Sequence, residues 1–269
     1  MARFDKKRAY VRVRRSAKNI SKEISRLKRD WLNRLEHVPL VDKQPPDGDA
    51  EPIYRYLPAP KHMTMDLTTV FENRSSHRTF SDEPLTDEDL GTILWAADGI
   101  NRPDGGRTTP STLNWHEVDV YCLKANGTWV YEPAKHALRF LDLEDIRNDT
   151  LLAQPLLRIA PVQLVFVAHK ERTMDWLMRS GKALLEKMGT EKWTPEKIDA
   201  LHMKSMTIDA AVKVQAVYMA AAALGIGCVC RTGFDEDVLH AHMPIDDNAR
   251  IICCMTLGYK AEKLSDAIS

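Results

Sequence analysis

The stretch TIDAAVKVQAVYMAAAALG, residues 207–225, decides the fold, because it predicts one long helix built mainly from small side chains. Alanine has the highest helix propensity, and its small side chain lets a neighbouring element pack closely against the helix. Asp209, Lys213 and Gln215 make the segment too polar for a membrane span, and it is also short for one. We therefore expect a core helix of a globular domain and no membrane span.

Apolar runs on either side of this helix predict strands of one central sheet. The run PVQLVFVA, residues 161–168, is continuously apolar, which is typical of a central strand that is buried on both faces. Residues 228–230 and 251–258 are rich in cysteine and β-branched side chains and predict two further strands. Helices and strands in this order indicate an α+β or an α/β fold.

Turn signals place a β-hairpin upstream of the central strand. Residues 118–123 and 129–132 are rich in strand-forming side chains and flank the dipeptide Asn126-Gly127. Asn-Gly favours a two-residue turn between antiparallel strands, because both residues tolerate positive φ. The segment that follows the hairpin, residues 134–153, is predicted to be mostly helical.

Two shorter helices are predicted before the hairpin. The first covers residues 65–72. The second begins after Thr86, whose hydroxyl can cap the backbone N–H of Asp89, and it ends at Gly99. Its apolar residues recur at helical spacing and are Leu90, Ile93, Leu94 and Ala97.

The N-terminal segment differs in composition from the rest of the chain. Residues 1–40 contain 13 Lys or Arg and 4 Asp or Glu, whereas the remainder contains 25 and 34. Residues 6–36 predict an amphipathic helix, and residues 41–62 predict an extended Pro-rich linker. We therefore divide the chain into a basic helix with its linker, residues 1–62, and a domain, residues 63–269. The helix is expected to dock on the acidic body or on a second subunit, and a contact with a membrane surface or nucleic acid is the alternative.

Composition argues against several classes of function. The formal net charge is zero, so no overall field attracts nucleic acid or an anionic membrane. The basic N-terminus has no apolar stretch of the kind found in secretory signals, which favours a cytoplasmic protein. The five cysteines are an odd number and lie in apolar, β-branched runs. They therefore indicate reduced thiols in buried strands and neither a disulfide framework nor a metal site.

Three turn-rich stretches carry the residues that could bind a ligand. In NRPDGGRTTPSTLNWHEVDVYCL, residues 101–123, glycines and short polar side chains precede a strand. Such a loop can present donors to a small flat ligand, or it can be only a turn. RSSHRTF, residues 74–80, sets two arginines beside serine hydroxyls, which suits a phosphate or forms an exposed basic loop. RTGFDEDVL, residues 231–239, contains Gly233, where backbone can approach a planar ring closely.

Motifs of several other sites are absent from the sequence. There is no nucleophile elbow of the type GxSxG, no Walker-type phosphate loop and no GxGxxG. Gly225-Ile226-Gly227 ends a helix instead of opening one, and the negative end of a helix disfavours phosphate. His240 and His242 lack a nearby set of carboxylates, so surface positions are expected for them. A Rossmann-type nucleotide site and a metal site are therefore both disfavoured.

The three stretches, in this order, resemble motifs of the FMN-dependent nitroreductase family. RSSHRTF resembles the family's opening Arg-x-Ser-x-Arg/Lys-x-Phe motif, TTPSTLNW its Pro-Ser-x-x-Asn loop, and RTGFD its Gly-Phe-Asp segment. IDAAVKVQAVYMAAAALGIG and MTLGYK are similar to its Ala-rich helix and closing strand, so the resemblance covers about residues 65–260. GINRPDGGRTTPS looks closest to the branch that contains thiazoline/oxazoline dehydrogenases.

The resemblance implies an α+β fold in which a mixed central sheet is flanked by helices, within an intertwined homodimer that binds FMN at its interface. It implies that residues 107–114 lie along the isoalloxazine ring and that residues 231–233 line the ring near its reactive nitrogen. The 74–80 stretch would bind the phosphate, the ribityl chain and the pyrimidine edge. Two lysines that could also contact the phosphate follow the closing Gly258-Tyr259, and Lys260 is the nearer one. The implied cofactor-binding residues are Arg74, Ser75, Ser76, Arg78, Pro110, Ser111, Thr112, Asn114, Arg231, Thr232, Gly233 and Lys260.

The resemblance also implies an activity. In an FMN-dependent oxidoreductase, NADH or NADPH would deliver hydride to FMN, and a small organic acceptor would then receive it. No residue is identified as a protein acid or base. Two alternatives stay open, namely flavin-dependent dehydrogenation of a peptide-derived heterocycle, and a flavin-binding partner protein with little turnover whose basic helix docks another macromolecule.

Overall fold

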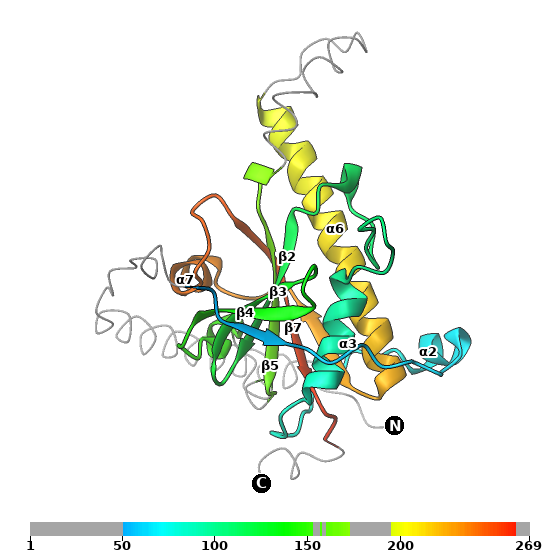
Figure 1. Ribbon diagram of the computed structural model, residues 1–269. Coiled ribbons are helices and arrows are strands. Elements are labelled where there is room, and N and C mark those ends of the chain that lie inside the picture. The colour runs from blue at the N-terminus through cyan, green and yellow to red at the C-terminus, as the bar shows by residue number, and fades with distance from the viewer. Residues whose placement is uncertain (1–50, 153–156, 158–159, 173–194, 262–269) are drawn as a thin grey trace, which may run out of the picture. The chain divides into compact units, whose positions relative to one another are not determined.

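The computed structural model describes residues 51–152, 157, 160–172 and 195–261 of the chain (Figure 1). Within these residues the strands form one seven-stranded sheet in the order β1-β4-β3-β2-β5-β7-β6. The strands are β1 (Tyr54–Tyr56), β2 (Val118–Lys124), β3 (Gly127–Glu132), β4 (Ala137–Asp142), β5 (Val162–Ala168), β6 (Gly227–Arg231) and β7 (Arg250–Gly258).

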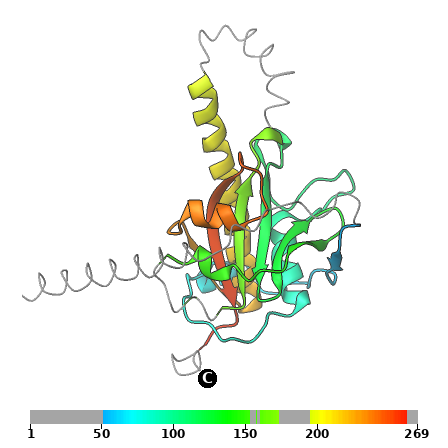
Figure 2. The same ribbon diagram turned by 90° about the vertical axis from the view of Figure 1, so that its left-hand side faces the viewer.

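Helices cover both faces of the sheet. The helices are α2 (Leu67–Asn73), α3 (Asp87–Asp98), α6 (Pro195–Leu224) and α7 (Glu236–His242), with 3-10 turns η1 (Thr112–Asn114) and η2 (Arg147–Thr150). Helices α3 and α6 lie side by side on one face, and α7 lies on the other (Figures 1 and 2). The larger apolar core lies under α3 and α6 and includes Phe166 and Ala210. A smaller one under α7 includes Val165 and Leu239, so β5 is buried on both faces, as its apolar run predicts.

Every strand pair in the described residues is antiparallel, although a mixed sheet was expected. Helix α6 connects β5 to β6, which point in the same direction. They are not neighbours, because β7 lies between them and pairs antiparallel with both. The predicted α+β class is confirmed.

The predicted end signals of α3 are confirmed. Thr86 precedes the helix, and its hydroxyl accepts a hydrogen bond from the backbone N–H of Asp89 at 3.1 Å. Gly99 follows the helix, and its N–H donates to the carbonyl of Trp95. The predicted hairpin also forms, with Gly127 opening β3 at a φ of 115°.

The predicted helix at residues 134–153 is wrong. Residues 137–142 form β4, which pairs with β3, and Arg147–Thr150 make only a 3-10 turn. A tight turn closes where His136 N–H donates to the Pro133 carbonyl, with His136 at a φ of 45°. This turn returns the chain along the free edge of β3, and pairing there overrides the helix propensity of the alanine and leucine residues.

Part of the segment predicted as an extended linker belongs to the sheet. Tyr54–Tyr56 pair with β4 as a short edge strand, and the other described residues before Met63 have no regular secondary structure. A short edge strand with prolines beside it limits pairing with other chains. Residues 41–50 and the predicted helix at 6–36 lie outside the described residues. The division of the chain at residue 62 therefore stays a prediction.

The cysteines lie on strands, as predicted. All five are free thiols on β2, β6 and β7, and only Cys230 is partly exposed. Burial raises the pKa of Cys122, Cys228 and Cys254 to about 12, which makes these thiols unreactive at neutral pH. The described residues contain no group of three or more His, Cys, Asp or Glu side chains that could hold a metal ion.

Helix α6 is longer than the 207–225 segment predicts, because it begins at Pro195. Its residues Asp199–Leu224 are long and apolar enough, by length and composition, to cross a membrane. The helix nevertheless packs against α3 and the sheet, and Ala210, Val217 and Ala221 on it are completely buried. These contacts agree with the predicted core helix.

The N-cap of α3 gives a test of local stability. Replacing Thr86 with alanine removes the acceptor for Asp89 N–H, so we expect the free energy of unfolding to fall by about 1 kcal/mol. The matched variant Thr86→Ser keeps the hydroxyl and is expected to stay within about 0.5 kcal/mol of the native protein. Urea unfolding followed by circular dichroism measures both. Equal losses in the two variants would contradict the cap.

Candidate functional site

The first group of candidate residues surrounds Tyr218 on the C-terminal half of α6. The hydroxyl of Ser76 lies 3.1 Å from the hydroxyl of Tyr218, which also accepts a hydrogen bond from the N–H of Cys230 at 2.8 Å. The guanidinium of Arg74 lies over the Tyr218 ring, 5.6 Å from its centre. The Tyr218 cluster is defined here as Tyr218, Arg74, Ser76, Arg78 and Lys260.

Backbone contacts fix the RSSHRTF stretch at the end of the sheet. The N–H of His77 donates to the Cys228 carbonyl at 2.9 Å, and Phe80 forms a β-bridge with Lys260. Phe80 is completely buried and packs edge-on against His77. Gly227 lies beneath them, where a Cβ would come within 3.2 Å of the Lys260 side chain. The basic side chains of the stretch are therefore carried by a fixed backbone.

Arg74, Arg78 and Lys260 bring three positive charges to this end of the sheet. Among the described residues, none of the three forms an ion pair with a carboxylate. Arg78 donates to the Ser76 carbonyl at 3.3 Å and is exposed, as is Ser75. Cations that the fold leaves without a carboxylate favour an external anion such as phosphate.

The second group lies in residues 107–116, termed here the Pro-Ser loop, which connects α3 to β2. Helix α3 holds the first part of this loop. The hydroxyl of Thr108 donates to the Trp95 carbonyl at 2.9 Å, and the hydroxyl of Thr109 donates to the Ala97 carbonyl at 2.7 Å. The C-terminal end of α3 therefore sets where the loop starts.

Helix α6 holds the middle of the loop. The carboxylate of Asp209 accepts hydrogen bonds from the N–H of Thr112 at 2.7 Å and from its hydroxyl at 3.0 Å. The hydroxyl of Ser111 accepts from the N–H of His116 at 3.1 Å and closes the loop on itself. Burial lowers the pKa of His116, and the charge of Arg107 lowers it further, so the imidazole is mainly neutral at pH 7.

The backbone of the Pro-Ser loop is strained. Leu113, Asn114 and His116 have φ values of 50°, 60° and 52°, a region that residues other than Gly, Asn and Asp seldom adopt. Pro110 and Asn114 are exposed next to this strained turn. Strained backbone that neighbouring bonds hold in place is concentrated at functional sites, which supports a role in ligand binding.

A buried ionic network lies behind the loop. Lys213 of α6 forms an ion pair with Asp98 at the end of α3, and the other oxygen of Asp98 accepts from Arg107 at 2.6 Å. The side chains of Lys213 and Asp98 are 1% and 3% exposed. Burial lowers the pKa of Lys213, and the Asp98 charge opposes that change. One network therefore joins α6, α3 and the first residue of the loop.

The third predicted stretch divides into a buried and an exposed part. The side chain of Arg231 is buried, and its guanidinium donates to acceptors on Thr150, Gln163 and Thr256. Thr232 and Gly233 are exposed, and no atom lies within 4 Å of the position that a Cβ at Gly233 would take. Only the backbone of Arg231 is therefore free to line a ligand, whereas Gly233 leaves open space beside it.

The Tyr218 cluster and the Pro-Ser loop contact α6 at two separate points. The loop is held at Asp209, and Ser76 contacts Tyr218, nine residues further along the helix. Because a helix rises 1.5 Å per residue, the two attachment points on α6 are about 14 Å apart along the helix axis. The structure therefore does not bring all the predicted residues together around one point of a single chain.

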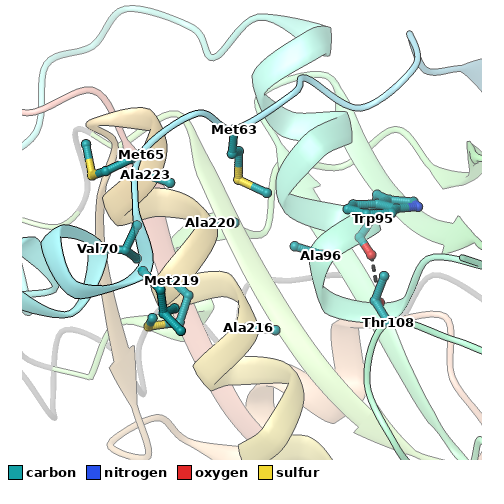
Figure 3. A pocket seen from close by; sticks show the side chains of 11 residues that line it. Met63, Met65, Val70, Trp95, Ala96, Thr108, Ala216, Met219, Ala220 and Ala223 are labelled. Carbon is teal, nitrogen blue, oxygen red and sulfur yellow. Dashed lines mark hydrogen bonds between the residues drawn. The ribbon is translucent and has the colours of Figure 1, made fainter.

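An apolar hollow of about 340 Å³ lies between α3 and α6, close to α2 (Figure 3). The Met63 side chain and the Trp95 ring border it, and alanines on α6 form its floor. Its lining residues are Met63, Met65, Leu67, Val70, Trp95, Ala96, Thr108, Ala216, Met219, Ala220 and Ala223. This surface suits an apolar partner or the flat face of a ring.

Sequence reasoning did not identify Tyr218, Asp209, Lys213 or the hollow as parts of a site. Asp209 and Lys213 are four residues apart in a helix made of small side chains, which places both on one face. That spacing is a signal of a buried polar network. The small residues Ala216, Ala220 and Ala223 also recur at helical spacing and could have indicated the hollow.

Comparisons with known proteins agree with this geometry. The sequence pattern of the nitroreductase family matches residues 71–259. A Methanocaldococcus jannaschii protein, provisionally named a nitroreductase, is 27% identical over 206 residues, covering 73% of this chain and 92% of its own. A Ralstonia eutropha crystal structure, also provisionally named a nitroreductase, has a TM-score of 0.66 and 29% identity, covering 82% of this chain and 95% of its own.

A third relative shares the fold at lower sequence identity. This Staphylococcus epidermidis crystal structure is provisionally named an NAD(P)H:FMN oxidoreductase. It has a TM-score of 0.51 and 14% identity, covering 76% of this chain and 91% of its own. Together with the match of the family pattern to most of the described domain, these likenesses show that the chain belongs to the nitroreductase family, whose members are oxidoreductases.

Proposed function

We propose that the protein is an FMN-dependent oxidoreductase that takes hydride from NADH or NADPH and passes it to a small organic acceptor. The observation that carries the proposal is the Tyr218 cluster, in which Arg74, Arg78 and Lys260 lack a carboxylate partner among the described residues. Membership of the nitroreductase family supports it, as does the provisional name of the Staphylococcus epidermidis protein, NAD(P)H:FMN oxidoreductase.

The residues present fit an FMN molecule. The cations of the Tyr218 cluster and the Ser76 hydroxyl would hold the phosphate end. Pro110, Ser111, Thr112 and Asn114 would offer polar groups to the pyrimidine edge, and the backbone at Thr232 and Gly233 would border the ring. FMN supplies the hydride chemistry when it is bound, and the chain supplies binding, orientation and exclusion of water.

We also propose that the site is completed by a second copy of the chain. The two groups of binding residues are attached to α6 at points about 14 Å apart along its axis, and in this proposal each flavin uses the Tyr218 cluster of one subunit and the Pro-Ser loop of the other. Leu67 and Phe71 on α2 and Ile208 on α6 are 66%, 58% and 51% exposed, and the apolar hollow between α3 and α6 lies close to α2. Such apolar surface supports a homodimer.

Several narrower assignments go beyond membership of the family. The likeness of GINRPDGGRTTPS to thiazoline/oxazoline dehydrogenases stays a prediction, as do the preference between NADH and NADPH and the cytoplasmic location. The role of a flavin-binding partner protein with little turnover also stays open. Anaerobic reduction by each nicotinamide, followed by turnover with nitroaromatic and thiazoline substrates, would separate the oxidoreductase from these alternatives.

The direct test of the proposed cofactor is the visible absorption spectrum of the purified protein. We expect a flavin spectrum, release of about one equivalent of FMN per chain on heating, and bleaching by NADH or NADPH without oxygen. A colourless protein that also fails to take up added FMN would overturn the proposal.

The Tyr218 cluster gives a quantitative test of FMN binding. Arg74→Ala and Lys260→Ala each remove a charged donor, so we expect each to raise the Kd for FMN by roughly 10- to 100-fold. Arg250→Ala is the control, because Arg250 is exposed at the opposite end of β7 from Lys260. Fluorescence titration of the apoprotein with FMN measures all three. Unchanged affinity in both cluster variants would contradict the assigned phosphate site.

Subunit complementation tests the shared site. One chain carries Arg74→Ala with Lys260→Ala, and the other carries Ser111→Ala with Asn114→Ala. If each site uses two subunits, the heterodimer contains one intact site and one site with all four changes. We expect one FMN per heterodimer and weak binding by either variant homodimer. If each site lies within one subunit, both sites of the heterodimer are damaged, and weak binding there would contradict sharing.

A further inference from the structure

Glu117 lies immediately before β2, behind the Pro-Ser loop, and its surroundings are unusual for a carboxyl group. It is completely buried, and within the described part of the chain its carboxyl oxygens meet no hydrogen-bond donor from another residue, its own backbone N–H being the one donor nearby. Only its backbone carbonyl is bonded, to the N–H of His169 at 2.8 Å. Buried acceptors are almost always hydrogen-bonded, so an ionised Glu117 would be a costly exception.

The side chain that faces Glu117 is another acid. The carboxyl group of Asp209 lies within hydrogen-bonding reach of it. Asp209 already uses both oxygens to accept from Thr112. Two ionised carboxylates in this position would repel each other and share no proton. A single proton on Glu117 removes the repulsion and gives Asp209 a further donor.

Charge balance around the pair also favours one proton. The charged and titratable groups around this pocket are Asp98, Asp209, Lys213, Arg107 and His116 from α3, α6 and the loop, together with Asp119 of β2, whose charge is balanced by its ion pair with Arg172. With His116 neutral, the positive charges of Lys213 and Arg107 balance the negative charges of Asp98 and Asp209. An ionised Glu117 would therefore leave one excess negative charge in a buried site. Burial, reinforced by Asp209, raises the pKa of Glu117 to about 7.

We propose that Glu117 is a positioning residue that keeps a proton in the folded protein up to about neutral pH, donates it in a hydrogen bond to Asp209, and thereby fixes the carboxylate that holds Thr112 and the Pro-Ser loop. The effect of this pair on flavin affinity rests on the proposed function. The shared proton itself does not, because it follows from burial and charge in the chain alone. The pair acts through the loop and is not assigned contact with the flavin.

The shift in the pKa of Glu117 makes the folded protein less stable as the pH rises. The folded-state pKa of Glu117 lies above the value of about 4.3 for an exposed glutamate, so the folded state binds the proton more tightly than the unfolded chain. Its stabilising contribution is complete below that lower pKa, decreases as the pH rises to about 7, and changes no further above it. If FMN requires the protonated pair, its Kd rises by up to about tenfold per pH unit above pH 7.

The experiment combines three readouts on the full-length protein, with Glu117→Gln as the variant. Glutamine keeps a neutral donor for Asp209, and Glu144→Gln is the control because Glu144 is exposed. Infrared spectra at pH 5.5 and pH 8.5 are recorded with side-chain ¹³C-labelled glutamate. Urea unfolding of the flavin-free protein and FMN titration are measured over the same pH range.

We expect a protonated glutamate band at pH 5.5 that shifts on ¹³C labelling, fades at pH 8.5 and is missing from Glu117→Gln. The fall of stability between about pH 5 and 7 and the weakening of FMN binding above pH 7 should also be reduced in this variant and unchanged in Glu144→Gln. Absence of the band in the wild-type protein, or the same pH slopes in Glu117→Gln, would overturn the proposal.

The infrared measurement on the wild-type protein does not depend on whether a variant folds. If no FMN binds at any pH, the proposed function fails, but the band and the stability slope still decide the role of Glu117.

Discussion

The ion pair between Lys213 of α6 and Asp98 of α3 is the interaction on which the candidate site depends. Both side chains are almost completely buried, where an unpaired charge is strongly destabilising and a paired one restricts how the helices can pack. Asp98 is the last residue of α3, and its second oxygen binds Arg107 at the start of the Pro-Ser loop. The buried ion pair therefore also fixes the position of the first residue of the loop.

This arrangement explains how a surface loop can be both strained and fixed. Threonine hydroxyls attach its start to α3, and Asp209 attaches its middle to α6. The backbone that follows the Asp209 attachment adopts positive φ at Leu113 and Asn114, which isolated loops rarely maintain. A rigid loop binds a ligand with a smaller loss of conformational entropy, so the buried network contributes to affinity without touching the ligand.

Local signals in the sequence were sufficient for much of the fold, since Thr86 caps α3 with its own hydroxyl, Gly99 leaves room for Trp95 where a Cβ would clash, and Gly127 adopts the positive φ of the hairpin turn. The strand at 137–142 could not be predicted in this way, because its structure depends on pairing with β3, a contact outside the segment. For the site, the motifs identified the exposed stretches. They did not show that Arg231 points into the core, because its partners lie on η2, β5 and β7.

A double-mutant cycle on Asp98→Asn and Lys213→Met tests most directly whether this buried pair organises the structure. Asp98→Asn leaves Lys213 buried without its carboxylate, so we expect it to lower the free energy of unfolding by about 3–5 kcal/mol, whereas Lys213→Met leaves Asp98 its bond to Arg107 and should cost less. The double variant should lose less than the sum of the two by about 1–3 kcal/mol, because no unpaired charge then remains between the helices. Losses that add within about 0.5 kcal/mol would contradict the account.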